Sequence, residues 1–268
     1  MKIGVLAVKG SADHTLIAYS LAKFQAEKEE VHLYEFDVVY PKLLTLFPWE
    51  GEVIYRRLPQ INREKCTLAR KCIEACNFRI LKEESGRLIH RSAICRGCGM
   101  CREVCPSRAI SWREVPAGEI GSVHQENITL FGGRLADQQA WEGFLIRQLK
   151  EKYPLKGDAA VLKAPLGLGA LSLRAIKEAE VFILVSEPYP ALEEEISTFG
   201  QILQGFGVPG VLLLRTEDVP SSLEKIVQSW GVKIWAIPQV QIEKGKAIYE
   251  VFPTSRKILE SIWSLGAA

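Results

Sequence analysis

Seven cysteines lie between positions 66 and 105 of this 268-residue chain. Four of them form the run C-x2-C-x2-C-x3-C-P, made by Cys95, Cys98, Cys101 and Cys105 with Pro106 behind them. In this spacing three close thiolates wrap one iron-sulfur cubane, while the fourth thiolate binds a neighbouring cluster. Four thiolates can also form a structural zinc site, but zinc ribbons normally present two separated C-x2-C pairs. The spacing therefore predicts iron-sulfur clusters, with zinc as the alternative.

A second, incomplete copy of the motif precedes the first. It consists of Cys66, Cys72 and Cys76, separated by five and three residues, and superposing the copies places Ala69 where a second cysteine is expected. The segment resembles the bacterial two-cluster ferredoxins, in which each copy supplies three ligand positions to its own cluster and one to the other. This exchange of ligands assigns four of the seven cysteines to one cluster and three to the other.

We expect one complete [4Fe-4S] cluster, with the ligands Cys76, Cys95, Cys98 and Cys101. The second cluster has three thiolates, from Cys66, Cys72 and Cys105. Its fourth iron is absent, bound by another group, or open to an exogenous ligand, so we expect a [3Fe-4S] or a labile [4Fe-4S] cluster there.

The cysteine segment is also basic. Residues 56–108 hold thirteen Lys or Arg against five Glu, whereas the whole chain has a net charge of +2, so the rest of the chain is net acidic. Cations can stabilise anionic thiolate-bound clusters and raise their potentials. An acidic redox partner would fit equally well. Nucleic acid is not expected as a partner, because the segment has no recognition motif and no interleaved aromatic residues.

Outside the cysteine segment, short apolar runs alternate with amphipathic stretches. This pattern predicts an α/β fold with a parallel sheet covered by helices on both faces. Strands are expected at 2–8, 31–36, 159–163, 181–186, 211–214 and 233–237. Helices are expected at 15–27, 138–151, 171–178, 192–206, 221–230 and 254–263. We expect residues 61–115 to form an inserted α+β ferredoxin-like domain and residues 1–60 and 116–268 to form the body.

The first expected strand runs into residues 8–15, VKGSADHT, and then into a helix. A phosphate-binding loop belongs at this place in an α/β fold. The chain resembles the MinD-type deviant P-loop ATPases, and more closely their branch with an inserted two-cluster ferredoxin domain. The family loop reads K-G-G-x-G-K-T-T, of which Lys9, Gly10 and Thr15 remain, and Asp37 matches an acidic residue that helps to arrange water and magnesium. The resemblance thus implies a weak nucleotide site at these four residues.

Other family positions are changed in this chain. Ser11 and Asp13 replace glycines, His14 replaces the main phosphate lysine, Leu16 the last threonine, Lys163 a magnesium-linked aspartate, and Leu214-Arg215 the base-reading N-K. Glycine amides cradle phosphate and the lysine neutralises it, so these changes remove what phosphoryl transfer needs. We expect a degenerate P-loop fold that is not a competent ATPase on its own, with ATP and magnesium doubtful as cofactors. An ATPase of altered chemistry is the alternative.

These observations favour an electron-transfer protein that exchanges electrons with a redox partner, on a P-loop scaffold that forms a homodimer or a heterodimer with a related ATPase. The alternatives are a cluster carrier or assembly factor, and a regulatory pseudo-ATPase that pairs with an active homologue through Lys9. The first apolar run, residues 3–8, is too short to span a membrane and lacks the features of a signal peptide. We therefore expect a cytoplasmic protein.

Overall fold

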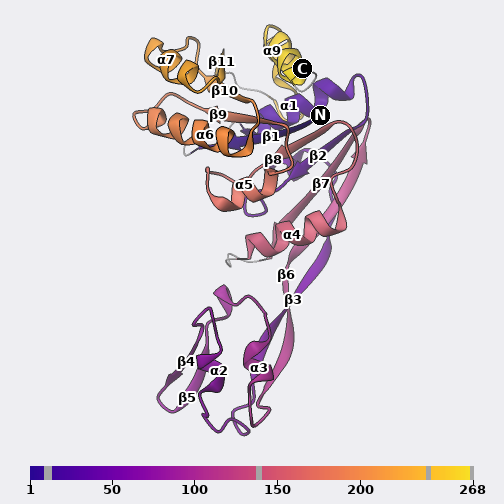
Figure 1. The fold of residues 1–268 in the computed structure, drawn as a ribbon. Coiled ribbons are helices and arrows are strands. Elements are labelled where there is room, and N and C mark those ends of the chain that lie inside the picture. The colour runs from indigo at the N-terminus through magenta and orange to yellow at the C-terminus, as the bar shows by residue number, and fades with distance from the viewer. Residues whose placement is uncertain (9–13, 137–140, 240–242, 266–268) are drawn as a thin grey trace.

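The computed structural model describes residues 1–8, 14–136, 141–239 and 243–265. Its main feature is a nine-stranded sheet in the order β11-β10-β9-β1-β8-β2-β7-β6-β3 (Figure 1). The strands are β1 (Lys2–Ala7), β2 (Val31–Glu35), β3 (Glu52–Ile61), β6 (Ile110–Gln125), β7 (Ile128–Leu135), β8 (Ala160–Lys163), β9 (Val181–Ser186), β10 (Gly210–Arg215) and β11 (Lys233–Ile237). Neighbours from β11 to β7 are parallel, and β6 and β3 continue the sheet antiparallel. The expected α/β class is confirmed, with a mostly parallel sheet.

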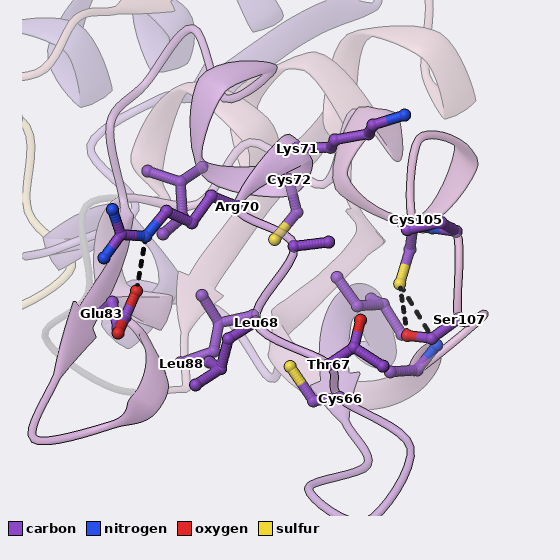
Figure 2. Close-up of a pocket in the computed structure, with 15 residues that line it drawn as sticks. Cys66, Thr67, Leu68, Arg70, Lys71, Cys72, Glu83, Leu88, Cys105 and Ser107 are labelled. Atoms are coloured by element: carbon purple, nitrogen blue, oxygen red, sulfur yellow. Dashed lines mark hydrogen bonds and ion pairs between the residues drawn. The ribbon is translucent and has the colours of Figure 1, made fainter.

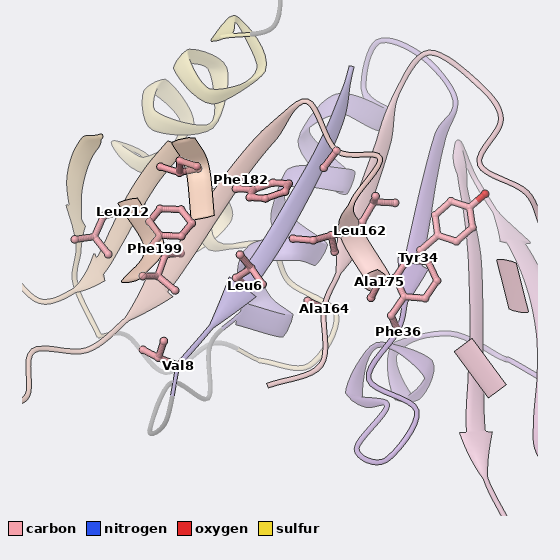
Figure 3. Packing of buried hydrophobic residues seen from close by; sticks show 14 of the residues in the cluster. Leu6, Val8, Tyr34, Phe36, Leu162, Ala164, Ala175, Phe182, Phe199 and Leu212 are labelled. Carbon is pink, nitrogen blue, oxygen red and sulfur yellow. The ribbon is translucent and has the colours of Figure 1, made fainter. Parts of the chain in front are cut away.

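Helices cover both faces of the sheet, as expected. One face is packed by α4 (Glu142–Lys152), α5 (Ala170–Ile176), α6 (Leu192–Phe206) and α7 (Ser221–Ser229). The other is packed by α1 (His14–Ala26), the 3-10 helix η1 (Lys42–Leu46), α8 (Ile248–Val251) and α9 (Ser255–Trp263). Figure 3 shows residues of the first of these cores, among them Leu6, Leu162 and Phe182 of three neighbouring strands. The central strands are mostly apolar, which suits the burial of both of their faces.

Each strand and helix expected from the sequence is present among the described residues, with ends that differ by a few residues. Part of the helix expected at 138–151 lies outside the described residues, and α4 begins at Glu142. Three strands of the main sheet were not expected, namely β3, β6 and β7. They extend one edge of the sheet, where β7 pairs with β2 in parallel and the β6–β7 hairpin reverses the chain.

The strands β3 and β6 form a two-stranded arm that carries the cysteine segment away from the body (Figure 1). Their pairing runs from Glu52 and Ile120 near the body to Ile61 and Ile110 at the far end. The segment between these ends contains α2 (Lys71–Glu74), β4 (Leu81–Glu84), β5 (Arg87–His90), the 3-10 turn η2 (Ser92–Ile94) and α3 (Met100–Glu103). Residues 110–115, which the sequence analysis assigned to the insertion, pair with β3 inside the arm.

Candidate iron-sulfur centre

The cysteine segment is an internal repeat in which each residue of the first copy matches the residue 29 positions later. The short helices α2 and α3 begin and end 29 positions apart. Three pairs of residues with positive φ have the same offset, namely Leu68 and Gly97 (54° and 66°), Arg70 and Gly99 (60° and 91°), and Arg79 and Arg108 (49° and 51°). Because left-handed conformations are rare outside glycine, their recurrence at one offset fixes the superposition. Ala69 matches Cys98, as the sequence analysis proposed.

Three of the cysteines line one hollow of about 380 Å³, which we call the three-cysteine hollow. Figure 2 shows the sulfur atoms of Cys66, Cys72 and Cys105 directed into it, from the two copies of the repeat. Ala69 lines the same hollow. Glu83 also lines it, but its Oε2 accepts a hydrogen bond from Arg70 Nε at 2.7 Å, at the edge of the hollow (Figure 2). The hollow thus has three thiol groups, and a methyl group where the other copy has a fourth.

The other four cysteines line a second hollow of about 330 Å³, the four-cysteine hollow. They are Cys76, Cys95, Cys98 and Cys101, and the wall between them includes Gly97, Gly99 and Trp112. The structure therefore gathers the seven cysteines into the same two groups that the ferredoxin-like exchange of ligands predicts. Among the described residues, no three His, Cys, Asp or Glu side chains converge on a single metal-ion position.

Both hollows have backbone features that suit an anionic sulfur cluster. The N–H of Gly97 donates to Cys95 Sγ at 3.3 Å, and the N–H of Ala109 donates to Cys105 Sγ at 3.3 Å. A Cβ at Gly97 would lie 2.9 Å from the carbonyl oxygen of Arg57, so only glycine fits this part of the loop. Amide donors of this kind stabilise thiolates and cluster sulfides. The residues present fit iron-sulfur clusters at both places.

The thiol groups differ in acidity according to their surroundings. Burial raises the pKa of Cys72 and Cys95, and it raises that of Cys101 to about 11. Burial also acts to raise the pKa of Cys105, but hydrogen bonds from Ser107 and Ala109 outweigh it and leave this pKa below its ordinary value. Since a metal ligand must be a thiolate, loading the hollows releases protons from the buried thiols.

A buried cation lies under the four-cysteine hollow. Arg56 of β3 is 5% exposed, and its Nη2 donates to the carbonyl oxygen of Cys95. Its guanidinium lies 5.2 Å from the ring centre of Trp141 and 4.8 Å from that of Phe144, at the start of α4. Arg56 thus joins the cysteine loop to the body, and its charge lies near the thiol group of Cys95.

Replacing Arg56 with methionine should lower the reduction potential of the cluster in the four-cysteine hollow. At an effective dielectric constant of about 20, removing a unit charge at a distance on the order of 10 Å corresponds to a shift of roughly 70 mV. An anaerobic redox titration followed by electron paramagnetic resonance measures it. Arg57→Met is the matched control, since Arg57 is adjacent but its side chain is 69% exposed. Equal shifts in the two variants would contradict a specific role of Arg56.

The nucleotide-site residues named from the sequence are only partly described. Lys9 and Gly10 lie outside the described residues. Thr15, in the first turn of α1, is buried, and its Oγ1 has no hydrogen-bond partner among the described residues. The Asp37 carboxylate accepts a hydrogen bond from the N–H of Tyr40 at 3.0 Å through Oδ1.

Lys163 is fully buried between two acidic residues at the carboxyl ends of β2 and β8. Its Nζ lies 2.9 Å from Glu35 Oε1 and 3.7 Å from Asp37 Oδ2. Glu35 also accepts hydrogen bonds from the N–H groups of Asp37 and Leu43. Burial raises the pKa of Glu35, while Lys163 and Leu43 oppose this shift. Both carboxylates therefore face the protein's own cation.

Two further residues of the site were not found from the sequence, Arg56 and Trp112. Arg56 belongs to β3 and Trp112 to β6, the two strands that the sequence analysis did not predict. The 29-residue offset, applied beyond the cysteines, would have placed Trp112 opposite Glu83 and so beside a hollow. Nothing in the sequence alone distinguishes Arg56 from its exposed neighbour Arg57.

Comparison with known proteins supports the motif and the fold separately. The family model described as "4Fe-4S binding domain" matches residues 90–111. The uncharacterized protein MJ0578 of Methanocaldococcus jannaschii is 27% identical over 197 residues, which are 70% of this chain and 68% of that protein. Indolepyruvate oxidoreductase subunit IorA of Methanothermobacter marburgensis is 35% identical over 71 residues, which are 26% of this chain and 11% of the subunit.

Among solved structures, the septum site-determining protein MinD of Pyrococcus horikoshii, complexed with Mg-ADP, superposes with a TM-score of 0.55 at 14% identity. The match covers 99% of this chain and 93% of that one. The chain therefore has the fold of the MinD-type P-loop ATPases, with a 4Fe-4S binding motif inserted into it. No helix in the described ranges is long and apolar enough to cross a membrane.

Proposed function

We propose that this protein transfers electrons through two iron-sulfur clusters, taking them from or passing them to a partner protein. The observation that carries the proposal is the grouping of the seven cysteines into two hollows of similar size, about 380 and 330 Å³. The four-cysteine hollow would hold a [4Fe-4S] cluster. The three-cysteine hollow would hold a [3Fe-4S] or a labile [4Fe-4S] cluster. Neighbouring clusters of this kind serve one-electron transfer, with potentials set by charge, hydrogen bonds and exposure.

The body would act mainly as a scaffold, and we propose that it is not a competent ATPase on its own. Lys163 supports this, because its ammonium group pairs with the carboxylates of Glu35 and Asp37. Phosphoryl transfer depends on charge stabilisation and positioning, often through a bound magnesium ion. We also propose that this scaffold forms a dimer, either with a second copy of the chain or with a related P-loop ATPase.

Anaerobic purification with iron and sulfide counts tests the cluster assignment. About seven irons per chain are expected for a [3Fe-4S] plus a [4Fe-4S] cluster, and about eight if an additional ligand completes the second cluster. Electron paramagnetic resonance should show reversible reduction by dithionite. A chain that binds about four irons, or whose clusters cannot be reduced and reoxidised, would rule out the two-cluster electron-transfer function.

A cluster carrier is the second candidate, and the three-cysteine hollow is the observation that favours it. A cluster held by three thiolates leaves one iron for a recipient protein to bind, which makes transfer easier. Incubating the reconstituted protein with an apo-ferredoxin tests this role. Transfer of the second cluster with retention of the first would support a carrier, and no transfer under conditions in which a known scaffold succeeds would exclude it.

A further inference from the structure

An open cleft separates the insert from the body next to the four-cysteine hollow. It is lined by Arg56 of the arm, by Phe78 and Arg96 of the insert, and on the body side by residues of α4 and α5 that include Arg147, Lys150 and Arg174. Phe78 and Arg96 also line the four-cysteine hollow. The two spaces therefore share a wall, and a molecule in the cleft would lie beside the [4Fe-4S] position. We call this space the basic cleft.

Positively charged side chains outnumber negatively charged ones in the lining of the basic cleft. Its lining includes six cationic side chains, which are Arg56, Arg96, Arg147, Lys150, Arg174 and Lys177, and one acidic side chain, Glu151. Arg147 pairs with Glu151 at 3.6 Å, and Lys150 pairs with Glu178 at 2.7 Å. The body as a whole is net acidic, since the positive charge of the sequence is concentrated in residues 56–108. Helices α4 and α5 thus continue the basic surface of the insert onto an otherwise acidic body.

The lining of the basic cleft, and not its size, favours a protein partner. Its volume of about 760 Å³ lies within the range of about 300–1000 Å³ that is typical of small-molecule pockets. Phe78, at its insert side, is 44% exposed, and aromatic residues are enriched where proteins bind one another. A complementary acidic surface would be steered toward the cleft by the charge.

We propose that the basic cleft is the docking site for an acidic electron-carrier protein, which exchanges electrons with the cluster in the four-cysteine hollow. This inference rests on the electron-transfer function proposed above. Each encounter moves one electron: the carrier loses it, and the cluster gains it. The shared wall formed by Phe78 and Arg96 places the docked carrier near the ligands Cys76, Cys95 and Cys98, which flank these residues in the chain.

A purified flavodoxin, which is an acidic electron carrier, serves as the probe for the full-length holoprotein. Its anionic hydroquinone loses one electron to become the neutral semiquinone as the cluster is reduced, and stopped-flow absorbance gives the second-order rate constant. Fluorescence anisotropy of labelled oxidised flavodoxin gives the affinity without any electron transfer. Both are measured between about 20 and 300 mM salt, because screening weakens long-range attraction.

The double variant Arg147→Glu with Arg174→Glu reverses two exposed charges on the body side of the cleft. The control is Lys225→Glu with Lys233→Glu, which makes the same charge change at exposed positions on α7 and β11, at the other edge of the sheet. We expect the cleft variant to lower both the rate constant and the affinity about tenfold at low salt and to flatten the salt dependence. The control should change them less than about twofold.

Reduction by dithionite separates the two proposals. If dithionite fails to reduce the wild-type clusters, the electron-transfer function fails, and the anisotropy titration still tests docking. Equal effects of the two double variants, no salt dependence, or no binding of flavodoxin would each overturn the docking site. Tighter binding of a single-stranded oligonucleotide than of flavodoxin, lost in the cleft variant, would overturn it in favour of nucleic acid.

Discussion

Replacing Ala69 with cysteine should turn the second cluster into a complete, stable [4Fe-4S] cluster. The 29-residue offset matches Ala69 with Cys98, and both residues line their hollows from exposed positions. A thiol at this position would supply the missing ligand, because Cys66, Cys72 and Cys105 already line the hollow. The iron count should rise from about seven to about eight per chain. Electron paramagnetic resonance of the oxidised protein should lose the signal of the [3Fe-4S] cluster.

The mirror-image variant Cys98→Ala provides the matched test. It removes the corresponding ligand from the four-cysteine hollow, so the first cluster should become as labile as the second and the iron count should fall by about one. The double variant, with Ala69→Cys and Cys98→Ala, exchanges the properties of the two hollows while keeping seven cysteines. If Ala69→Cys leaves the iron count and the spectrum unchanged, another group already completes the second cluster.

The grouping of the cysteines could be predicted because ligand spacing is a local property of the chain. The loops between Cys95, Cys98 and Cys101 are too short to reach different sites, and the second copy repeats the pattern with one position changed. The central strands were also predictable, since both of their faces are buried and each contains a short, mostly apolar run.

The arm could not be predicted, for reasons that its residues make clear. Strands β3 and β6 contain Pro59 and Pro116, and a proline normally argues against a strand. These prolines are tolerated because the arm extends the edge of the sheet, beyond the parallel core. Most of the remaining side chains of β3 are exposed or half-buried, so no continuous apolar run marks it. Arg56 was missed because its burial depends on Trp141 and Phe144, which lie far away in the sequence.

The contact between Lys163 and Glu35 could likewise not be predicted from the sequence, although Lys163 had been singled out. They are 128 positions apart, and only the parallel pairing of β2 with β8 brings Glu35 beside Lys163. Their pairing changes how the substitution at Lys163 is understood. The lysine does more than replace an acidic residue of the family, because it neutralises the two carboxylates that remain.

Replacing Lys163 with methionine should therefore destabilise the body by about 3–5 kcal/mol at pH 7. The change leaves Glu35, which is 0% exposed, and the nearly buried Asp37 without their counter-ion, and breaking a buried ion pair on one side carries a cost of this size. Urea unfolding under anaerobic conditions, followed by far-ultraviolet circular dichroism, measures the free energy of unfolding. Lys225→Met removes an exposed lysine and should change it by less than about 0.5 kcal/mol.

The pH dependence of the Lys163→Met variant gives a sharper test of this explanation. Burial already raises the pKa of Glu35 above its unfolded value, and without Lys163 it should rise further. A carboxyl with a raised folded pKa loses stability as the pH rises and regains it as the pH falls toward the unfolded pKa. The variant should therefore approach the wild type between about pH 7 and pH 5, and the added change Glu35→Gln should restore at least half of the loss at pH 7. A loss that is independent of pH, or that is not relieved by Glu35→Gln, would show that Lys163 contributes through packing and not through its charge.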